Sequence, residues 1–574
     1  MHRAAQGAGG LRLLDRRLEE TWLGWAELEA RAERVAAGLT ALGLEPGERV
    51  ALIYPTGKAF FDAFFATLLA GAVPVPLYPP VRLGRLDEYH RRTAAMLRAA
   101  GARLVLADPR VARLLGETAA LARPALGVRR LDELPDGSPA AGTRAPLPAD
   151  LALVQFSSGT TVEPKPVALS HRAILAQTRA LNASWPGGET IRHTGVSWLP
   201  LYHDMGLIGC VFAALALGTD LTLLPPEAFV ARPALWLQAI SRYRATVSPA
   251  PNFAYALAVE RVRDEELEGV DLSTWRVALN GAETVAPPVL RAFCDRFARW
   301  GFRREALTPV YGLAEAALAV TFSDLGRPFV GRRFEREALA EGRARLDDAG
   351  VEIVSVGRPL AGFEVEIRSE DGRSLGAARV GHVWVRGPSL MDGYLDLPEA
   401  TTKALRDGWL DTGDLGFLDE GELFLTGRAK DMVLLRGRNF APAEIEQAVD
   451  PLPGVRTGCS VAASWLPEGA DGERLVLLVE TRKGISPQDA EALPERCKKE
   501  VLAAVGVAPD EVVVLEPGTL PRTSSGKLRR QESLRRWRAG ELTPPDAVGP
   551  VGIALAFGRS TLAYARAGGR RGRG

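Results

Sequence analysis

The 574-residue chain is 47% hydrophobic and 25% charged, which is ordinary for a water-soluble protein and too long for a single core. Its 71 Lys and Arg residues against 70 Asp and Glu leave no global field to attract nucleic acid or a membrane, so electrostatic recognition must be local. The 4 cysteines are widely spaced, which argues against structural zinc and a disulfide framework and favours a reducing, cytoplasmic location. No secretion signal or membrane-spanning stretch is recognisable.

Helical and β-rich patterns alternate through the first half of the chain. Helical periodicity runs from about residue 21 to residue 44, and the apolar run at 49–54 is typical of a buried strand. The same alternation continues with expected helices at 59–69 and 88–100 and expected strands at 103–107, 151–156, 196–200, 220–224 and 245–248. It predicts an α/β fold with layered subdomains and a largely parallel sheet.

The pattern changes twice towards the C-terminus. From residue 351, short strands and turns predict a small barrel-like β section, and past Gly427 a compact α+β segment begins. We therefore expect a large N-terminal region at 1–426, a smaller, mobile C-terminal domain at 427–545 and a basic tail at 546–574. The tail is expected to be flexible, with at most a weak peripheral contact to an anionic membrane surface.

A loop rich in hydroxyl groups follows the expected strand at 151–156. Small residues let backbone N–H groups approach phosphate oxygens, hydroxyls add donors and a lysine adds a positive charge. The residues concerned are Ser158, Gly159, Thr160, Thr161 and Lys165. The spacing does not match the common Gly-x-x-x-x-Gly-Lys-Ser/Thr pattern, and on its own residues the loop fits an ordinary turn better.

Six further stretches place polar residues at the ends of expected elements. Tyr311 and Glu315 offer an aromatic face for stacking and a carboxylate for a metal, and Asp414 offers two acceptor oxygens for vicinal hydroxyls. The small turn at 281–283 follows a buried strand, where ligands gather in α/β sheets. The other three stretches are 199–206, 427–431 and 521–527. Taken singly, each also fits a turn, a helix start or a solvated charge.

In order and spacing, these seven stretches resemble the adenylate-forming (AMP-forming) synthetases, over residues 22–537. Within that superfamily the chain looks most like the fatty acyl-AMP ligases. The supporting stretches are 197–209, 311–316, 434–439 and the long segment 322–356, which resembles the insertion that separates these ligases from acyl-CoA synthetases.

The resemblance implies that a fatty acid is activated with ATP and magnesium to an acyl-adenylate, with release of pyrophosphate. The acyl group would then pass to the phosphopantetheine thiol of a separate acyl carrier protein or of a carrier domain of a polyketide or peptide synthase. It also implies a role for each matching residue: Lys527 between carboxylate and α-phosphate; Ser158, Gly159, Thr160, Thr161 and Lys165 on the other phosphates; Glu315 and Thr160 on magnesium; Asp414 and Arg428 on the ribose; Tyr311, Gly312, Gly281, Ala282 and Glu283 around adenine; Lys430 at the hinge; and His203, Met205, Gly206 and Gly209 along the acyl pocket.

The phosphate loop departs from the family, because Val162 and Pro166 stand where glycines are usual. This departure leaves open a nucleotide-binding regulator that has lost turnover. A separate alternative among enzymes is an acyl-CoA synthetase that makes a CoA thioester. The presence of Lys527, Glu315 and Asp414 argues against the regulator. The sequence fixes neither the acyl chain length nor the acceptor thiol.

Overall fold

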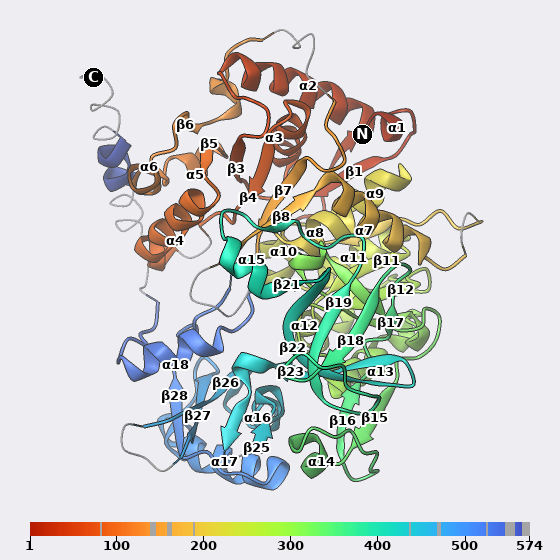
Figure 1. Cartoon of the computed structure of the whole chain (residues 1–574), viewed down its shortest axis with the longest axis vertical. Helices are drawn as coiled ribbons and strands as arrows, with labels where there is room; N and C mark the ends of the chain where they lie inside the picture. The colour runs from red at the N-terminus through yellow and green to blue at the C-terminus, as the bar shows by residue number, and fades with distance from the viewer. Residues whose placement is uncertain are drawn as a thin grey trace.

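A computed structural model describes residues 1–80, 83–137, 145–157, 164–187, 190–435, 438–467, 472–523, 526–545 and 557–564. The described part of the chain forms a large N-terminal region and a smaller C-terminal domain, drawn in blue at the bottom of Figure 1. None of the helices in these ranges combines the length and apolar character needed to cross a bilayer.

The largest sheet has nine strands, and its central strands are parallel. In spatial order they are β17 (Arg358–Pro359), β14 (Ala319–Phe322), β13 (Leu307–Gly312), β12 (Val277–Asn280), β11 (Val247–Ala250), β9 (Gly195–Ser197), β10 (Leu221–Leu223), β1 (Gly10–Leu14) and β2 (Glu20–Gly24). The parallel core of this sheet confirms the predicted α/β fold class.

Two smaller sheets complete the layered part. A parallel sheet has the order β4 (Val73–Pro76), β3 (Arg49–Ile53), β5 (Ala102–Ala107) and β6 (Gly127–Arg129). An antiparallel sheet has the order β20 (Gly393–Tyr394), β8 (Pro166–Ser170) and β7 (Leu151–Phe156). The second of these positions the chain on both sides of the phosphate loop.

Helices connect and cover these sheets. They are α1 (His2–Ala5), α2 (Trp25–Ala41), α3 (Lys58–Leu69), α4 (Leu86–Ala99), α5 (Pro109–Ala112), α6 (Gly116–Ala122), α7 (His171–Ala183), α8 (Asp204–Gly206), α9 (Ala213–Leu217), α10 (Pro226–Ala231), α11 (Ala234–Arg242), α12 (Asn252–Arg261) and α13 (Pro287–Phe297). The start of α7 illustrates the local cause, because the Ser170 side chain accepts a hydrogen bond from Ala173 N.

Buried aromatic rings fill the core beneath the central strands. Trp236 meets Trp275 edge to face with ring centroids 5.1 Å apart. Each indole N–H has a partner, since Trp236 donates to Ser248 Oγ at 2.8 Å and Trp275 donates to the Val277 carbonyl at 3.0 Å. Ser248 lies on β11 and Val277 on β12, so this packing anchors the strands that lead to the site.

Residues 21–24 differ from the expected helix. They belong to β2, which pairs antiparallel with β1, and the helix begins only at Trp25. The Trp22 ring packs 4.7 Å from the guanidinium of Arg12. These cross-strand contacts override the helical periodicity of the sequence, which carries no information about a partner strand.

The predicted barrel-like β section is present and forms a half-barrel. Its strands are β18 (Glu364–Arg368), β19 (Gly381–Arg386), β22 (Trp409–Asp419), β21 (Leu405–Arg406) and β23 (Glu422–Arg428), with α15 (Pro398–Ala404) beside them. The expected insertion forms a hairpin of β15 (Gly331–Phe334) and β16 (Val351–Val354) with α14 (Arg336–Ala340) between the two strands.

The C-terminal domain has an α+β arrangement and its own apolar core. It contains β24 (Val433–Leu435), β25 (Arg438–Phe440), α16 (Pro442–Val449), β26 (Val455–Trp465), β27 (Arg474–Thr481), α17 (Pro487–Val505), β28 (Glu511–Leu515) and α18 (Arg530–Arg538). The last strand of the half-barrel, β23, runs to Arg428, two residues past the boundary expected at 426.

Charged contacts join the C-terminal domain to the large region on two sides. Arg536 of α18 pairs with Glu88 of α4 at 2.6 Å. On the other side the insertion reaches the domain, because Arg336 pairs with Glu444. Beside that pair, Glu337 lies 3.6 Å from Arg438. Figure 1 shows the insertion hairpin lying next to this domain.

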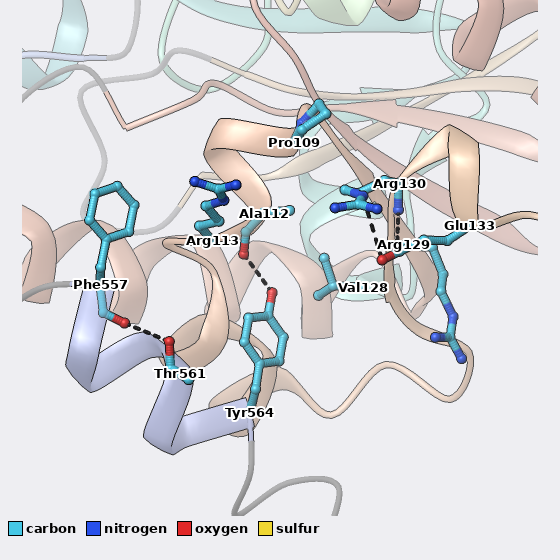
Figure 2. A pocket seen from close by; sticks show the side chains of 10 residues that line it. All are labelled: Pro109, Ala112, Arg113, Val128, Arg129, Arg130, Glu133, Phe557, Thr561 and Tyr564. Carbon is cyan, nitrogen blue, oxygen red and sulfur yellow. Dashed lines mark hydrogen bonds and ion pairs between the residues drawn. The ribbon is translucent and has the colours of Figure 1, made fainter.

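Residues 557–564 of the tail form a helix on the N-terminal region, whereas a flexible tail was expected. Tyr564 donates its hydroxyl hydrogen to the Ala112 carbonyl at 2.8 Å (Figure 2). Ser560 Oγ accepts a hydrogen bond from Gly116 N at 2.8 Å. Phe557 packs on Leu86 and Leu114. The apolar contacts explain the difference, because the sequence does not show that this part of the tail has a partner surface within the same chain. A pocket of about 540 Å³ beside this helix is lined by none of the predicted site residues.

Replacing Gly116 with alanine is expected to release this helix. A β-carbon at Gly116 would lie 1.9 Å from the Ser560 carbonyl oxygen. Because that oxygen belongs to the backbone, it cannot rotate away as a flexible side chain could. We expect trypsin to cleave after Arg559 several times faster in the variant than in the wild-type protein. Gly558→Ala is the control, since nothing lies within 4 Å of a β-carbon there. Equal cleavage of the Gly116 variant and wild type would contradict this docking.

Candidate active site

The predicted residues gather where neighbouring strands of the main sheet end. The turn at 281–283 follows β12 directly, and Tyr311 lies near the end of the adjacent parallel strand β13. The carboxyl ends of parallel strands form one edge, where ligands of open α/β sheets bind. Asp414 and Arg428 come from the half-barrel, and Lys527 comes from the C-terminal domain.

Asp414, which is itself buried, is the centre of a polar cluster at the site. Tyr311 donates its hydroxyl hydrogen to Asp414 Oδ2 at 2.7 Å, and Arg428 Nε lies 3.1 Å from Oδ1. Asp414 and Arg428 are directly opposite each other in the β22–β23 pair. Burial raises the pKa of the Tyr311 phenol, and the Asp414 carboxylate raises it further, so the phenol stays a donor. Each carboxylate oxygen keeps free lone-pair capacity for another donor.

The turn at 281–283 is held in a strained conformation. Ala282 has a φ of 71°, which is uncommon for a residue with a side chain and typical of functional sites. Glu283 Oε1 accepts a hydrogen bond from Phe253 N at 2.5 Å, at the start of α12. Burial raises the pKa of the Glu283 carboxyl. Gly281 packs on β13, where a β-carbon would meet the Val310 side chain at 2.7 Å.

Glu315 and Lys165 are brought to the same place from distant parts of the chain. Tyr394 donates its hydroxyl hydrogen to Glu315 Oε1 at 2.9 Å, and Lys165 Nζ lies 4.4 Å from the centroid of the Tyr394 ring. Burial raises the pKa of the Glu315 carboxyl. Burial also lowers the pKa of the Lys165 ammonium, and the nearby charge of Lys430 lowers it further. Gly312 is required sterically, because a β-carbon would fall 1.9 Å from the Leu318 carbonyl oxygen.

Lys527 is presented by a tight turn of the C-terminal domain. Thr523 N donates to the Lys527 carbonyl at 2.7 Å, and Lys527 N donates to Thr523 Oγ1 at 3.1 Å. Burial lowers the pKa of the Lys527 ammonium, and the negative charge of Asp204 opposes this most strongly. The charges that act on Lys527, including those of Glu283 and Asp414, belong to the large region, so the turn reaches the strand edge described above.

Lys430 lies in the short turn Ala429–Asp431 between the half-barrel and the C-terminal domain, and it is exposed. Its carbonyl accepts a hydrogen bond from Gln531 Nε2 at 2.9 Å. Its charge acts on Lys165, so the predicted hinge lies close to the lysine that is predicted to bind phosphate.

His203 and Asp204 begin the short helix α8. His203 Nδ1 lies 2.5 Å from Asp204 Oδ1, and Asp204 Oδ1 also accepts from Met205 N at 2.7 Å. Burial opposes ionisation of Asp204, but the adjacent His203 outweighs it, so the pKa of this carboxyl is lowered. Asp204 therefore supplies a buried negative charge that acts on Lys527.

Neighbouring atoms occupy the space beside the two glycines that were expected to line the acyl pocket. A β-carbon at Gly206 would lie 2.3 Å from the Pro200 carbonyl oxygen, and one at Gly209 would lie 2.7 Å from Leu318 Cδ2. Both glycines thus permit close packing of α8 and of the π-helix Leu207–Phe212 that follows it. The acyl pocket at His203, Met205, Gly206 and Gly209 stays a prediction.

The phosphate loop lies mostly outside the described residues, including Ser158, Gly159, Thr160, Thr161 and Val162. Ser157 N donates to the Lys165 carbonyl at 3.0 Å, which closes the base of the loop. Pro166 is the first residue of β8, opposite Phe156. A proline is tolerated at that position of a strand, so it does not disturb the pairing of β7 with β8.

The described residues contain no group of three or more His, Cys, Asp or Glu side chains that could hold a metal ion. Glu315 is a single carboxylate with one oxygen bonded to Tyr394. That donor set fits magnesium, which is commonly held by one or two carboxylates together with substrate phosphates and waters.

Sequence reasoning missed Tyr394 and gave Asp204 no role towards Lys527. A tyrosine after a glycine in the two-residue strand β20 carries no recognisable signal, and its partners Glu315 and Lys165 lie far away in the chain. For Asp204 a signal did exist. A carboxylate next to a histidine at a helix start is held in place, so it could have been predicted to balance the charge of a nearby lysine.

Comparison with known proteins gives consistent matches over almost the whole chain. The family model described as AMP-binding enzyme matches residues 2–395. A Caulobacter vibrioides protein, provisionally named an acyl-CoA synthetase, is 37% identical over 552 residues, covering 94% of this chain and 94% of that protein. A Moorena producens protein named a medium-chain-fatty-acid–acyl-carrier-protein ligase is 33% identical over 546 residues, covering 92% of this chain and 91% of that protein.

The fold has a match of the same kind. A solved structure from studies of fatty acyl-adenylate ligases from E. coli and L. pneumophila has a TM-score of 0.88 to this chain at 35% identity. It covers 94% of this chain and 97% of its own. The arrangement of large α/β sheets, half-barrel and C-terminal α+β domain is therefore common to both.

Proposed function

The chain belongs to the AMP-binding family of adenylate-forming enzymes, and we propose that it is a fatty acyl-AMP ligase whose acceptor is a carrier-protein thiol. Adenylation is the chemistry of the family, and several of the similar proteins, including the Moorena ligase and the fatty acyl-adenylate ligase of solved structure, are named for fatty acids. The choice of acceptor, the use of magnesium and the roles of individual residues are our proposal.

In the first half-reaction, an oxygen of the fatty acid carboxylate attacks the α-phosphorus of ATP. A carboxylate–phosphate anhydride bond forms, the bond between the α- and β-phosphates breaks, and pyrophosphate leaves. Both reactants are anions, so positioning and charge stabilisation dominate the catalysis. Lys527 supplies a cation between carboxylate and α-phosphate, and Lys165 supplies one for the departing phosphates.

The nucleoside is held by the polar cluster around Asp414. The remaining lone pairs of Asp414 accept the two ribose hydroxyls, while Arg428 and the Tyr311 hydroxyl keep the carboxylate in place. Adenine lies between the Tyr311 ring and the turn at 281–283. Magnesium, when bound, neutralises phosphate charge, and Glu315 is the described side chain that would hold it.

In the second half-reaction, the carrier thiol attacks the acyl carbonyl carbon and loses its proton to solvent. A thioester bond forms, the bond between the acyl carbon and the phosphate oxygen breaks, and AMP leaves. This step needs a different position of the C-terminal domain, reached by rotation at Lys430, where a few dihedral angles can absorb the change.

The observation that carries the choice of carrier protein over CoA is the insertion packed on the C-terminal domain. Its ion pairs, Arg336 with Glu444 and Glu337 with Arg438, favour the domain position of the first half-reaction. A ligand shifts such an equilibrium only by its differential affinity for the second position. A folded carrier protein can supply this differential affinity through contacts made by its own surface, whereas a small thiol such as CoA makes fewer contacts.

Competition between acceptors tests this proposal. The wild-type protein is given one fatty acid, ATP and magnesium, with CoA and a pantetheine-bearing carrier protein at equal concentration, and products are separated by mass. We expect acyl-carrier to form and acyl-CoA to stay near background. Acyl-CoA formed at the same rate or faster would favour the second candidate, an acyl-CoA synthetase, which the similarity to the Caulobacter protein supports.

The pH profile of adenylation is expected to be narrow on both sides. Lys527 acts as a cation, and since burial lowers its pKa, activity should fall on the alkaline side before an exposed lysine would titrate. Glu315 acts as an anion, and since burial raises its pKa, activity should fall on the acid side above the ordinary carboxyl range. The kcat/KM for ATP, which reports the free enzyme, is the quantity to measure.

The matched variant for the acid side is Glu315→Gln. Its kcat/KM for ATP should no longer fall on the acid side (the acid limb of the profile) but should still fall on the alkaline side. A wild-type profile that stays flat from about pH 4.3 to about pH 10.4, the ordinary values for Glu and Lys, would contradict the assignment of both groups.

A further inference from the structure

Tyr394 stands between two oppositely charged groups of the proposed site. Its ring carries the Lys165 ammonium at 4.4 Å from the centroid, and its hydroxyl donates to Glu315 Oε1 at 2.9 Å. Within the described residues, no ion pair joins Lys165 to Glu315 directly. One neutral side chain therefore binds a cation through its π-face and an anion through its hydroxyl.

The backbone around Tyr394 is fixed to both elements that it joins. Asp392 N and Leu395 N donate to the carbonyls of Ala168 and Pro166 on β8, at 3.0 and 2.8 Å. Met391 N donates to the Glu315 carbonyl at 2.8 Å. The segment 391–395 thus ties the strand that follows the phosphate loop to the turn that carries Glu315.

The side chain has little freedom within this frame. Tyr394 is 8% exposed, and its backbone N donates to Thr401 Oγ1 at 2.9 Å, at the first turn of α15. Burial raises the pKa of the phenol, and the Glu315 carboxylate raises it further, so the hydroxyl remains a hydrogen donor at physiological pH. A fixed ring with a permanent donor suits positioning rather than proton transfer.

Direct contact would make Lys165 and Glu315 partners of each other rather than of ATP. A lysine and a carboxylate in a half-buried site attract strongly and would form an ion pair. Tyr394 offers each of them a weaker, neutral partner instead, its ring to the ammonium and its hydroxyl to the carboxylate. Both charges thereby remain available to the triphosphate and its metal.

We propose that Tyr394 is a positioning residue that holds Glu315 through its hydroxyl and Lys165 through its ring, keeping the two charges apart and aimed at the triphosphate. The inference rests on the proposed function, because it takes Glu315 as the magnesium-binding carboxylate and Lys165 as a phosphate-binding lysine. It assigns the hydroxyl of Tyr394 to the magnesium-binding residue and the ring of Tyr394 to the phosphate-binding residue.

Two variants separate the two halves. Tyr394→Phe keeps the ring and removes the hydroxyl, whereas Tyr394→Leu removes both. ATP affinity is measured by calorimetry, once in magnesium and once in EDTA with no divalent ion. In EDTA, Tyr394→Phe should bind ATP like the wild-type protein, and Tyr394→Leu should bind about five- to tenfold more weakly because Lys165 has lost its support.

The effect of magnesium on ATP affinity should separate the role of the Tyr394 hydroxyl from that of the ring. We expect the gain in ATP affinity on adding magnesium to fall about tenfold in Tyr394→Phe, the usual loss for one hydrogen bond to a charged group. The same substitution should have no further effect on that gain in a Glu315→Gln background, because the two residues act as a unit. Thermal melting of each variant reports whether the fold is intact.

A second readout is the acid limb of the exchange activity. The charged and titratable groups that act on Glu315 are Tyr394, Arg428, Asp204 and Lys165. The Tyr394 hydrogen bond favours the ionised carboxylate, so its removal in Tyr394→Phe should move the acid limb to higher pH. A merely structural role would lower activity without moving the limb.

Tyr243 gives a matched control on the surface. Its hydroxyl donates to Glu20 Oε2 at 3.0 Å, and its ring lies 5.4 Å from the Arg12 guanidinium. Tyr243→Phe and Tyr243→Leu thus lose the same two kinds of contact away from the site, and neither should change ATP affinity.

The outcomes are distinct. Wild-type protein without fatty-acid-dependent ATP–pyrophosphate exchange would overturn the proposed function and this inference with it. An active wild-type protein whose magnesium gain and acid limb are unchanged in Tyr394→Phe would overturn the role of the hydroxyl alone. Equal ATP affinity of the Leu and Phe variants in EDTA would overturn the role of the ring.

Discussion

Replacing Lys527 with alanine is expected to slow acyl-adenylate formation by about a hundredfold or more, the usual loss when one preorganised electrostatic stabiliser is removed. The ammonium group lies among the charges of Asp204, Glu283 and Asp414, which belong to the large region. Without it, the fatty acid carboxylate must approach the α-phosphate with no cation between the two anions. ATP–pyrophosphate exchange with a saturating fatty acid measures this rate.

The control and the kinetic pattern make the Lys527 result specific. Lys499→Ala removes an exposed lysine from α17 of the same domain and should leave exchange unchanged. The KM for ATP should change little in Lys527→Ala, because the lysine acts on the reacting groups rather than on the nucleoside. Exchange within about threefold of wild type would remove Lys527 from the catalytic site.

Asp414→Asn is expected to weaken productive ATP binding by roughly ten- to a hundredfold, since hydrogen bonds to a charged acceptor contribute about 1.5–3 kcal/mol each. The carboxylate is 7% exposed and already fixed by Tyr311 and Arg428. An amide has only one acceptor oxygen, so it cannot serve these two donors and two ribose hydroxyls together.

Comparison of ATP with 2′-deoxy-ATP isolates the ribose contact. The wild-type protein should lose kcat/KM with the deoxy substrate, and Asp414→Asn should show a much smaller further loss. Asp407→Asn is the control, because Asp407 is exposed, and its positive φ of 51° is tolerated by both Asp and Asn. Equal discrimination by the Asp414 variant and wild type would place the ribose elsewhere.

The regular part of the fold could be predicted because its signal is local. The apolar runs at 49–54 and 103–107 are strands, and the repeated alternation with helices identified a parallel sheet. Strand β2 and the helix at 557–564 could not be predicted, because each forms against a distant partner: β1 in one case, and the surface near Gly116 in the other.

The candidate site divides in the same way. The resemblance to adenylate-forming enzymes, confirmed by the comparisons, implied that Asp414 and Arg428 hold the ribose and that Tyr311 lies at the adenine. The structure brings these three side chains into contact, and their roles stay predictions. The left-handed backbone of Ala282 could not be predicted, because glycine or asparagine is the normal signal for it. The role of Tyr394 could not be predicted either, because it depends on contacts with Glu315 and Lys165, which are distant in the sequence.

ATP–pyrophosphate exchange by the wild-type protein, measured across a series of fatty acids, is the decisive measurement. The proposed chemistry predicts saturable exchange that needs both a fatty acid and ATP and that is lost in Lys527→Ala. Saturable ATP binding without exchange for any fatty acid in the series would contradict it, and would indicate a nucleotide-binding regulator built on the same fold.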